Sequence, residues 1–104
     1  MATKGYNGQD EGADVAKAMA KLIAPLSIDQ LETLTIDAIH QHRALLAKAE
    51  AAFESLQRAD TTEANSIDEL RETYTKEMLA ARAQQMVLAA LIERLGYIPR
   101  MPPS

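Results

Sequence analysis

The sequence predicts an all-α fold, in which a short N-terminal helix precedes an antiparallel hairpin of two long helices, and two copies dimerise into a four-helix bundle. Apolar residues recur every three or four positions along two stretches of about 30 residues. Each stretch opens on a helix-start pattern and contains no internal Gly or Pro. The 104 residues are therefore expected to form a single helical domain, residues 1–104.

A short helix is expected at about residues 13–24, and Pro25 blocks its extension. Four apolar residues share one side of it: Val15, Met19, Leu22 and Ile23. Residues 1–12 are rich in Gly, Asn, Gln and Asp and lack apolar periodicity, and residues 100–104 contain paired prolines. Both ends of the chain are expected to be disordered.

The first long helix is expected at about residues 28–57. Ser27 and Gln30 form a capping-box pattern, in which each side chain satisfies a backbone N–H at the helix start. The hydroxyl of Thr35 can bond to the carbonyl one turn earlier. The apolar stripe of this helix consists of Ile28, Leu31, Thr35, Ala38, Ile39, His42, Leu45, Leu46, Ala49, Ala52, Phe53 and Leu56.

The second long helix is expected at about residues 67–95, after a polar segment at residues 57–66 in which the chain should reverse. Ser66 and Glu69 form a second capping-box pattern, and Gly96 is expected to be a left-handed cap. The apolar stripe of this helix consists of Ile67, Leu70, Tyr74, Met78, Ala81, Leu88, Leu91, Ile92 and Leu95.

The run MVLAALI, residues 86–92, is apolar on every side of the second helix. A helix with this pattern is covered from more than one direction, and a hairpin partner covers only one. The simplest remedy is a second copy of the chain. The sequence therefore predicts a homodimer whose interface includes Met86, Val87 and Ala90.

Charge and composition limit the possible partners. The net charge is −4, and the basic residues are scattered along the chain, which disfavours direct nucleic-acid binding and suits a basic protein partner. Without cysteine there can be no disulfide or thiolate metal site. The sequence contains no signal-peptide pattern and no apolar run long enough to span a bilayer, so a cytoplasmic protein without membrane contact is expected.

Asp37, His40 and His42 are the candidates for a metal site. On a helix the two histidines point about 200° apart, so at most two of the three side chains can meet at one ion, and zinc needs three or four protein ligands. No nucleophile lies beside a base, and no Gly-rich loop could hold a phosphate. The sequence thus predicts no enzyme, metal, cofactor or small-molecule substrate.

The stretch LETLTIDAIHQHRALLAKAEAAFESL, residues 31–56, together with LGYIPR, residues 95–100, resembles the TraM family of quorum-sensing anti-activators. The resemblance implies a helical homodimer that binds the LuxR-type activator TraR and blocks its binding to promoter DNA. The resemblance also implies that conjugal plasmid transfer genes are repressed in this way, without catalysis or cofactor.

The same resemblance suggests which residues bind the activator: Leu22, Leu31, Leu56 and Tyr74 as apolar anchors, with Asp37 and Gln84 as polar contacts. Each apolar candidate is equally compatible with a place in the bundle core, because residues on the apolar stripe usually pack internally. The alternative function is a structural helical homodimer, or scaffold, without a regulatory target.

Overall fold

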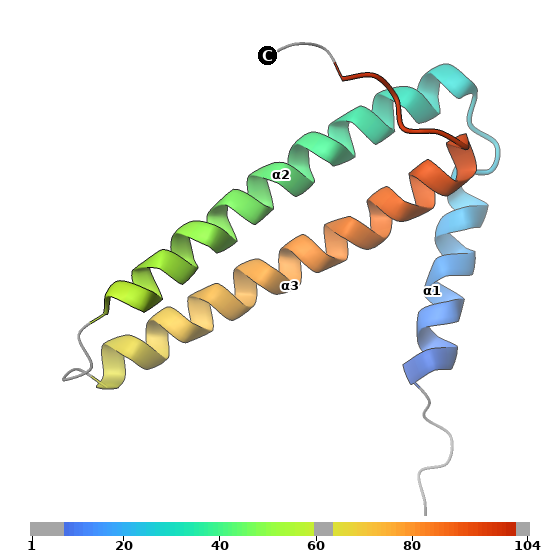
Figure 1. Cartoon of the computed structure of the whole chain (residues 1–104). Helices are drawn as coiled ribbons and strands as arrows, with labels where there is room; N and C mark the ends of the chain where they lie inside the picture. The colour runs from blue at the N-terminus through green and yellow to red at the C-terminus, as the bar shows by residue number, and fades with distance from the viewer. Residues whose placement is uncertain (1–7, 60–63, 102–104) are drawn as a thin grey trace, which may run out of the picture.

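The computed structural model describes residues 8–59 and 64–101, which form three helices and no strand (Figure 1). Helix α1 spans Gly8–Ile23, α2 spans Ile28–Arg58 and α3 spans Ala64–Leu95. The prediction of an all-α fold is confirmed for these residues. Residues 1–7 and 102–104, part of the ends expected to be disordered, lie outside the described residues.

Helix α1 begins at Gly8, earlier than the expected start near residue 13, so residues 8–12 are helical rather than irregular. The helix ends just before Pro25, as the sequence indicates. A tight turn follows, in which the amide of Ala24 donates to the carbonyl of Ala20 at 3.0 Å and that of Leu26 donates to Ile23 at 3.1 Å.

Helix α2 begins with the predicted capping box. The amide of Gln30 donates to the Ser27 hydroxyl at 3.1 Å, and the amide of Ser27 donates to the Gln30 side chain at 3.0 Å. Thr35 is fully buried, and its hydroxyl donates to the Leu31 carbonyl at 2.6 Å. This bond is the one expected of Thr35, and it satisfies the buried hydroxyl.

Helix α3 begins at Ala64, so Ser66 lies within its first turn and is not the N-cap that the sequence indicates. Residues 60–63 of the expected reversing segment lie outside the described residues, whereas residues 57 and 58 still belong to α2. The predicted end of α3 is confirmed: Gly96 has a φ of 90°, and its amide donates to the Ile92 carbonyl at 2.8 Å.

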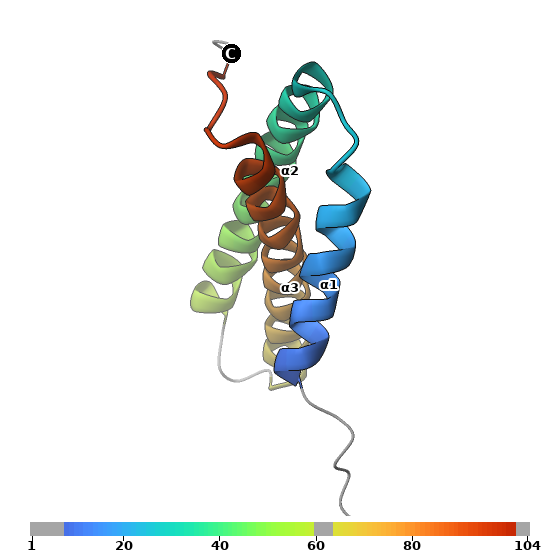
Figure 2. The same ribbon diagram turned by 90° about the vertical axis from the view of Figure 1, so that its right-hand side faces the viewer.

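The three helices form a flat, open molecule. Helices α2 and α3 lie side by side with opposite chain directions, and α1 diverges from the C-terminal half of α3 (Figures 1 and 2). The molecule measures 55 × 55 × 14 Å, and its radius of gyration of 18.1 Å exceeds the roughly 13 Å of a compact domain of this length. The chain is therefore about one helix thick.

The core is small and lies where the three helices meet. Leu31, Ala38 and Leu91 form a buried cluster, against which partly buried apolar residues pack: Ile23, Leu26, Leu88 and Leu95. Ile39, Ala49, Ala81 and Pro99 are also buried. This end of the molecule positions the candidate residues that lie near α1.

Candidate functional site

A groove of about 470 Å³ lies between all three helices. Helix α1 lines it with Leu22, α2 with Leu34 and Asp37, and α3 with Gln84 and Val87. Three of the predicted activator-binding residues are thereby brought together from three different helices. Most of the lining residues are apolar, so the groove is an apolar surface that is open to solvent in the single chain.

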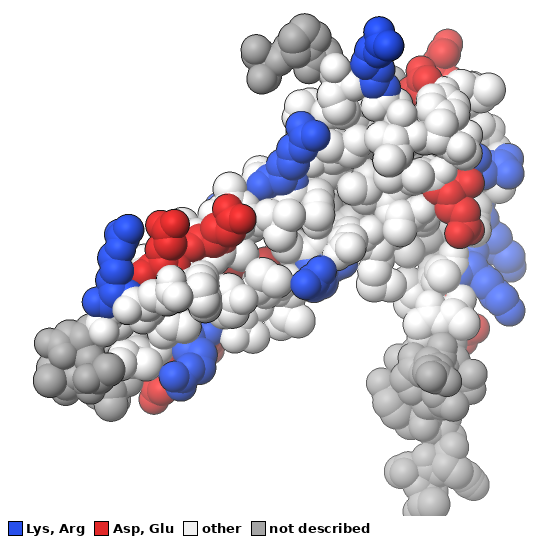
Figure 3. Space-filling model, in the orientation of Figure 1, with Lys and Arg blue, Asp and Glu red and all other residues white. Residues whose placement is uncertain are grey.

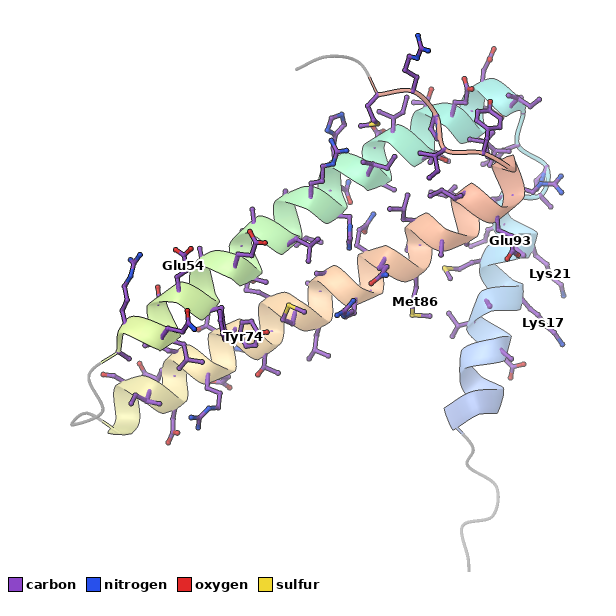
Figure 4. The ribbon with its side chains drawn as sticks, viewed as in Figure 1. Lys17, Lys21, Glu54, Tyr74, Met86 and Glu93 are labelled. Atoms are coloured by element: carbon purple, nitrogen blue, oxygen red, sulfur yellow. The ribbon has the colours of Figure 1, made fainter. Side chains whose placement is uncertain are left out.

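A second groove, of about 700 Å³, lies on the other side of α1. Met86 lines it and points from α3 toward α1 (Figure 4), with Lys21 and Glu93 among the charged residues at its edge. Val87 lines the first groove, Met86 the second and Ala90 both. The three predicted dimer residues therefore do not share one face, because α1 approaches α3 between them.

The apolar activator-binding candidates differ widely in exposure. Leu22 is 75% exposed on α1, whereas Leu31 is 4% exposed and belongs to the buried cluster. The structure thus gives Leu31 a packing role and leaves its side chain out of reach of a partner. Leu56 and Tyr74 are half-buried.

Leu56 and Tyr74 belong to the opposite end of the α2–α3 pair. The rings of Phe53 and Tyr74 are 5.4 Å apart between centroids and tilted by 45°, which is a favourable aromatic contact. Tyr74 lies toward the end of α3 that is remote from α1 (Figure 4). The candidates therefore separate into a groove group, near α1, and a distal pair, Leu56 and Tyr74, toward the C-terminal end of α2.

Two long-range bonds hold the end where the helices meet. The guanidinium of Arg94 donates to the Ala24 carbonyl at 2.8 Å, and the phenol of Tyr97 donates to the Glu32 carboxylate. The Glu32 hydrogen bond, with desolvation and nearby negative charge, raises the pKa of Tyr97. The sequence singled out the LGYIPR motif, but no spacing rule could pair Tyr97 with Glu32, because 65 positions separate them.

Charged side chains of both signs are interspersed with uncharged surface (Figure 3). Two ion pairs among the described residues join neighbours on one helix: Arg58 with Glu54 at 3.8 Å and Arg71 with Asp68 at 3.7 Å, all well exposed. Exposed pairs of this kind add little stability. The visible face carries no large patch of a single sign.

The structure does not bring Asp37, His40 and His42 together as a group of potential metal ligands. Asp37 and His40 are exposed, His42 is half-buried, and no group of three potential ligands occurs within the described residues. In the same part of the chain, none of the helices is long and apolar enough to cross a membrane.

Comparisons with known proteins agree on one family. The sequence model of the family described as "Prokaryotic Transcriptional repressor TraM" matches residues 1–100. The chain is 36% identical over 69 residues to the transcriptional repressor TraM of Agrobacterium fabrum, covering 66% of this chain and 68% of that protein. It is 35% identical over 71 residues to TraM of Rhizobium radiobacter, covering 68% and 70%. No solved structure gives a significant match.

Proposed function

Because this chain belongs to the TraM family of transcriptional repressors, we propose that it represses transcription as an anti-activator, by binding a LuxR-type quorum-sensing activator of the TraR kind. The bound activator no longer holds its promoter DNA, and conjugal plasmid transfer genes stay off. The protein acts in the cytoplasm without catalysis or cofactor.

Charge supports action through a protein rather than on DNA. A formal charge of −4 opposes binding to phosphates, which draws most of its free energy from Lys and Arg. The same charge favours encounter with a basic surface, such as the DNA-binding region of an activator. Occupation of that region would exclude DNA directly.

The observation that carries this proposal is the open, one-helix-thick arrangement, which leaves apolar side chains on the surface of the described chain. Contiguous apolar surface on a soluble protein marks an interaction site. We assign the activator contact to Leu22 on α1 and to the distal pair Leu56 and Tyr74. Leu31 is left out because the core already buries it.

The proposal includes a homodimer organised as a four-helix bundle. A buried cluster of three residues is a small core for a chain of 104 residues, and chains of this size are marginal unless they bury much of their surface. A second copy of the α2–α3 pair supplies the missing apolar cover.

A gel-shift titration tests the function. An activator of the TraR kind, loaded with its signal and bound to labelled promoter DNA, is challenged with increasing amounts of this protein. We expect the shifted band to disappear at near-stoichiometric addition, and no band from this protein with DNA alone. An undisturbed band, with a protein that is helical and dimeric, would instead favour the structural homodimer without a regulatory target.

A further inference from the structure

We propose that the second groove, between α1 and α3, binds an amphipathic helix of a partner protein in which Asp and Glu residues flank an apolar stripe. We call this surface the α1–α3 groove. It lies apart from the activator contact, which was assigned to Leu22 and the distal pair and to a basic region of the activator. The proposal therefore goes beyond the proposed function and adds a second partner of opposite charge.

The lining of the α1–α3 groove suits a helix. The volume is about 700 Å³, and eight of the eleven lining residues are apolar. Five of these eight are alanines, so the backbone of a bound helix can come close to both walls. Met19 on α1 and Met86 on α3 add flexible side chains that adapt to an apolar partner. An apolar trough of this kind is typical of proteins that bind an amphipathic helix.

The apolar surface continues out of the groove along α3. Leu79 precedes Met86 by two helical turns, so the two side chains share one side of α3, and they are 66% and 48% exposed. Leu88, which packs against the buried cluster, lies about 160–180° from both, so α2 leaves this side of α3 uncovered. From Leu79 to Arg94 the surface is about 22 Å long, which matches a helix of about 15 residues.

Positive charge surrounds this apolar surface. Lys21 and Arg94 line the groove, and Lys17 projects from the same edge of α1 as Lys21 (Figure 4). The guanidinium of Arg94 is held beside the groove by its 2.8 Å bond to the Ala24 carbonyl. Arg82 lies on α3 between the two exposed apolar side chains of the preceding paragraph. Four cations therefore border a surface on a chain whose net charge is −4.

Few carboxylates oppose these cations. Within residues 16–24 and 79–94, which form the surface, the acidic residue is Glu93, which also lines the groove. Asp14 lies one turn before Lys17, beyond the groove lining. The local charge is therefore opposite in sign to that of the whole chain.

This local charge decides which partner fits. Carboxylates beside the apolar stripe of a bound helix can pair with the surrounding lysines and arginines, whereas a basic segment is repelled. The apolar floor provides affinity, and the charged rim provides the rate of encounter and the selection of partners. One chain can thus hold an acidic helix at the α1–α3 groove and a basic activator surface elsewhere.

A peptide-binding assay tests the proposal. The probe is a fluorescein-labelled synthetic helix of about 18 residues, with Leu along one stripe and Glu on both sides of it. A matched peptide has Lys in place of every Glu. Fluorescence anisotropy should show the acidic peptide binding at least about tenfold more tightly, although the net charge of the protein favours the basic one. Equal affinities, or no binding of the acidic peptide, would overturn the proposal.

Matched substitutions locate the bound peptide. Leu79→Ala and Met86→Ala shorten exposed side chains of the surface, and Ile28→Ala shortens one that is 63% exposed on α2. We expect the first two to raise the peptide Kd at least about threefold and Ile28→Ala to leave it unchanged. Lys21→Gln should weaken binding more than Lys48→Gln, which removes the same charge from α2. Equal effects within each comparison would place the peptide elsewhere and overturn the proposal.

Thiol labelling covers the case in which these substitutions lower helicity, as measured by circular dichroism. The chain contains no cysteine, so Met86→Cys and Ser55→Cys each introduce a single thiol at an exposed position. Saturating acidic peptide should slow the labelling of Met86→Cys at least about tenfold and leave that of Ser55→Cys unchanged. Labelling of Met86→Cys that is already slow without peptide would show that the groove is covered, and would contradict the proposal.

The gel-shift titration separates this inference from the proposed function. With saturating acidic peptide present, we expect the protein to remove the activator from DNA as efficiently as without it, because the two partners use different surfaces. Inhibition that disappears with the peptide would give the groove to the activator, and would overturn the second partner while the anti-activator function stands. Peptide binding by a protein that never inhibits the activator would leave the groove assignment in place and remove the anti-activator function.

Discussion

The phenol of Tyr97 donates a hydrogen bond to the carboxylate of Glu32, which joins the segment after α3 to the start of α2. Gly96, with a φ of 90°, provides the turn that returns the chain toward α2. Arg94 reaches the Ala24 carbonyl at the same end of the molecule. These two bonds fix the corner from which α1 diverges.

The first prediction concerns pH. The bond to Glu32 raises the pKa of Tyr97 in the folded state above the ordinary value of about 10. The stabilisation is therefore complete below about pH 10 and is lost as pH rises through the folded-state pKa. The destabilisation caused by Tyr97→Phe, measured by urea unfolding, should be larger at pH 8 than above pH 11.

Glu32→Gln is the control for this prediction. It retains a hydrogen-bond acceptor and removes the negative charge, so the pKa of Tyr97 should fall toward its ordinary value. Absorbance titration measures this, with the Tyr97→Phe protein subtracted to isolate the one phenol. An unchanged Tyr97 titration in Glu32→Gln would show that the carboxylate does not act on the phenol in solution.

The second prediction concerns the start of α2. Ser27→Ala removes the acceptor for the Gln30 amide, and loss of such a cap costs about 0.5–2 kcal/mol. Thermal unfolding followed by circular dichroism should show a lower Tm. Ser55→Ala, an exposed change within α2, is the matched control and should not lower the Tm. Equal Tm values for Ser27→Ala and the unsubstituted protein would mean that the capping box adds no stability.

The third prediction concerns the distal pair. Tyr74→Ala removes the ring that contacts Phe53 and should lower the free energy of unfolding by about 1–3 kcal/mol. Tyr74→Phe keeps the ring, and the Tyr74 hydroxyl bonds to no other described residue, so stability should change by less than about 0.5 kcal/mol. A gel-shift titration with Tyr74→Phe then tests whether the hydroxyl contacts the activator: if it does, more protein is needed to remove the activator from DNA. A large loss of stability in Tyr74→Phe would contradict the view that Tyr74 stabilises the fold mainly through its ring contact with Phe53.

Sequence periodicity predicted the two long helices because their signals are local. The capping box at Ser27, the left-handed turn at Gly96 and the bond from Thr35 each depend on residues within one or two turns. The same kind of signal failed at Ser66, since the preceding residues 64 and 65 are also helical and the motif lies inside α3. A capping pattern permits a helix start but does not require one.

Non-local features could not be predicted in this way. The apolar run at residues 86–92 was assigned to a second copy, but α1 lies against part of it and separates Met86 from Val87. The angle at which α1 approaches α3 depends on packing at the corner and on Arg94, neither of which has a sequence period. Leu22 and Leu31 belong to similar apolar stripes, yet one is exposed and the other buried.

The last prediction uses this difference between Leu22 and Leu31. Leu31→Ala empties space in the buried cluster and should cost about 2–5 kcal/mol. Leu22→Ala truncates a side chain that is 75% exposed, so unfolding should change by less than about 0.5 kcal/mol. If Leu22 anchors the activator, its truncation raises the amount of protein needed to remove the activator from DNA, because anchors at an interface contribute most of the binding free energy. Leu79→Ala is the control for a general effect of lost apolar surface, because Leu79 is also an exposed leucine but lies on α3. Full inhibition by Leu22→Ala would remove α1 from the activator contact and leave the distal pair as its remaining apolar candidate.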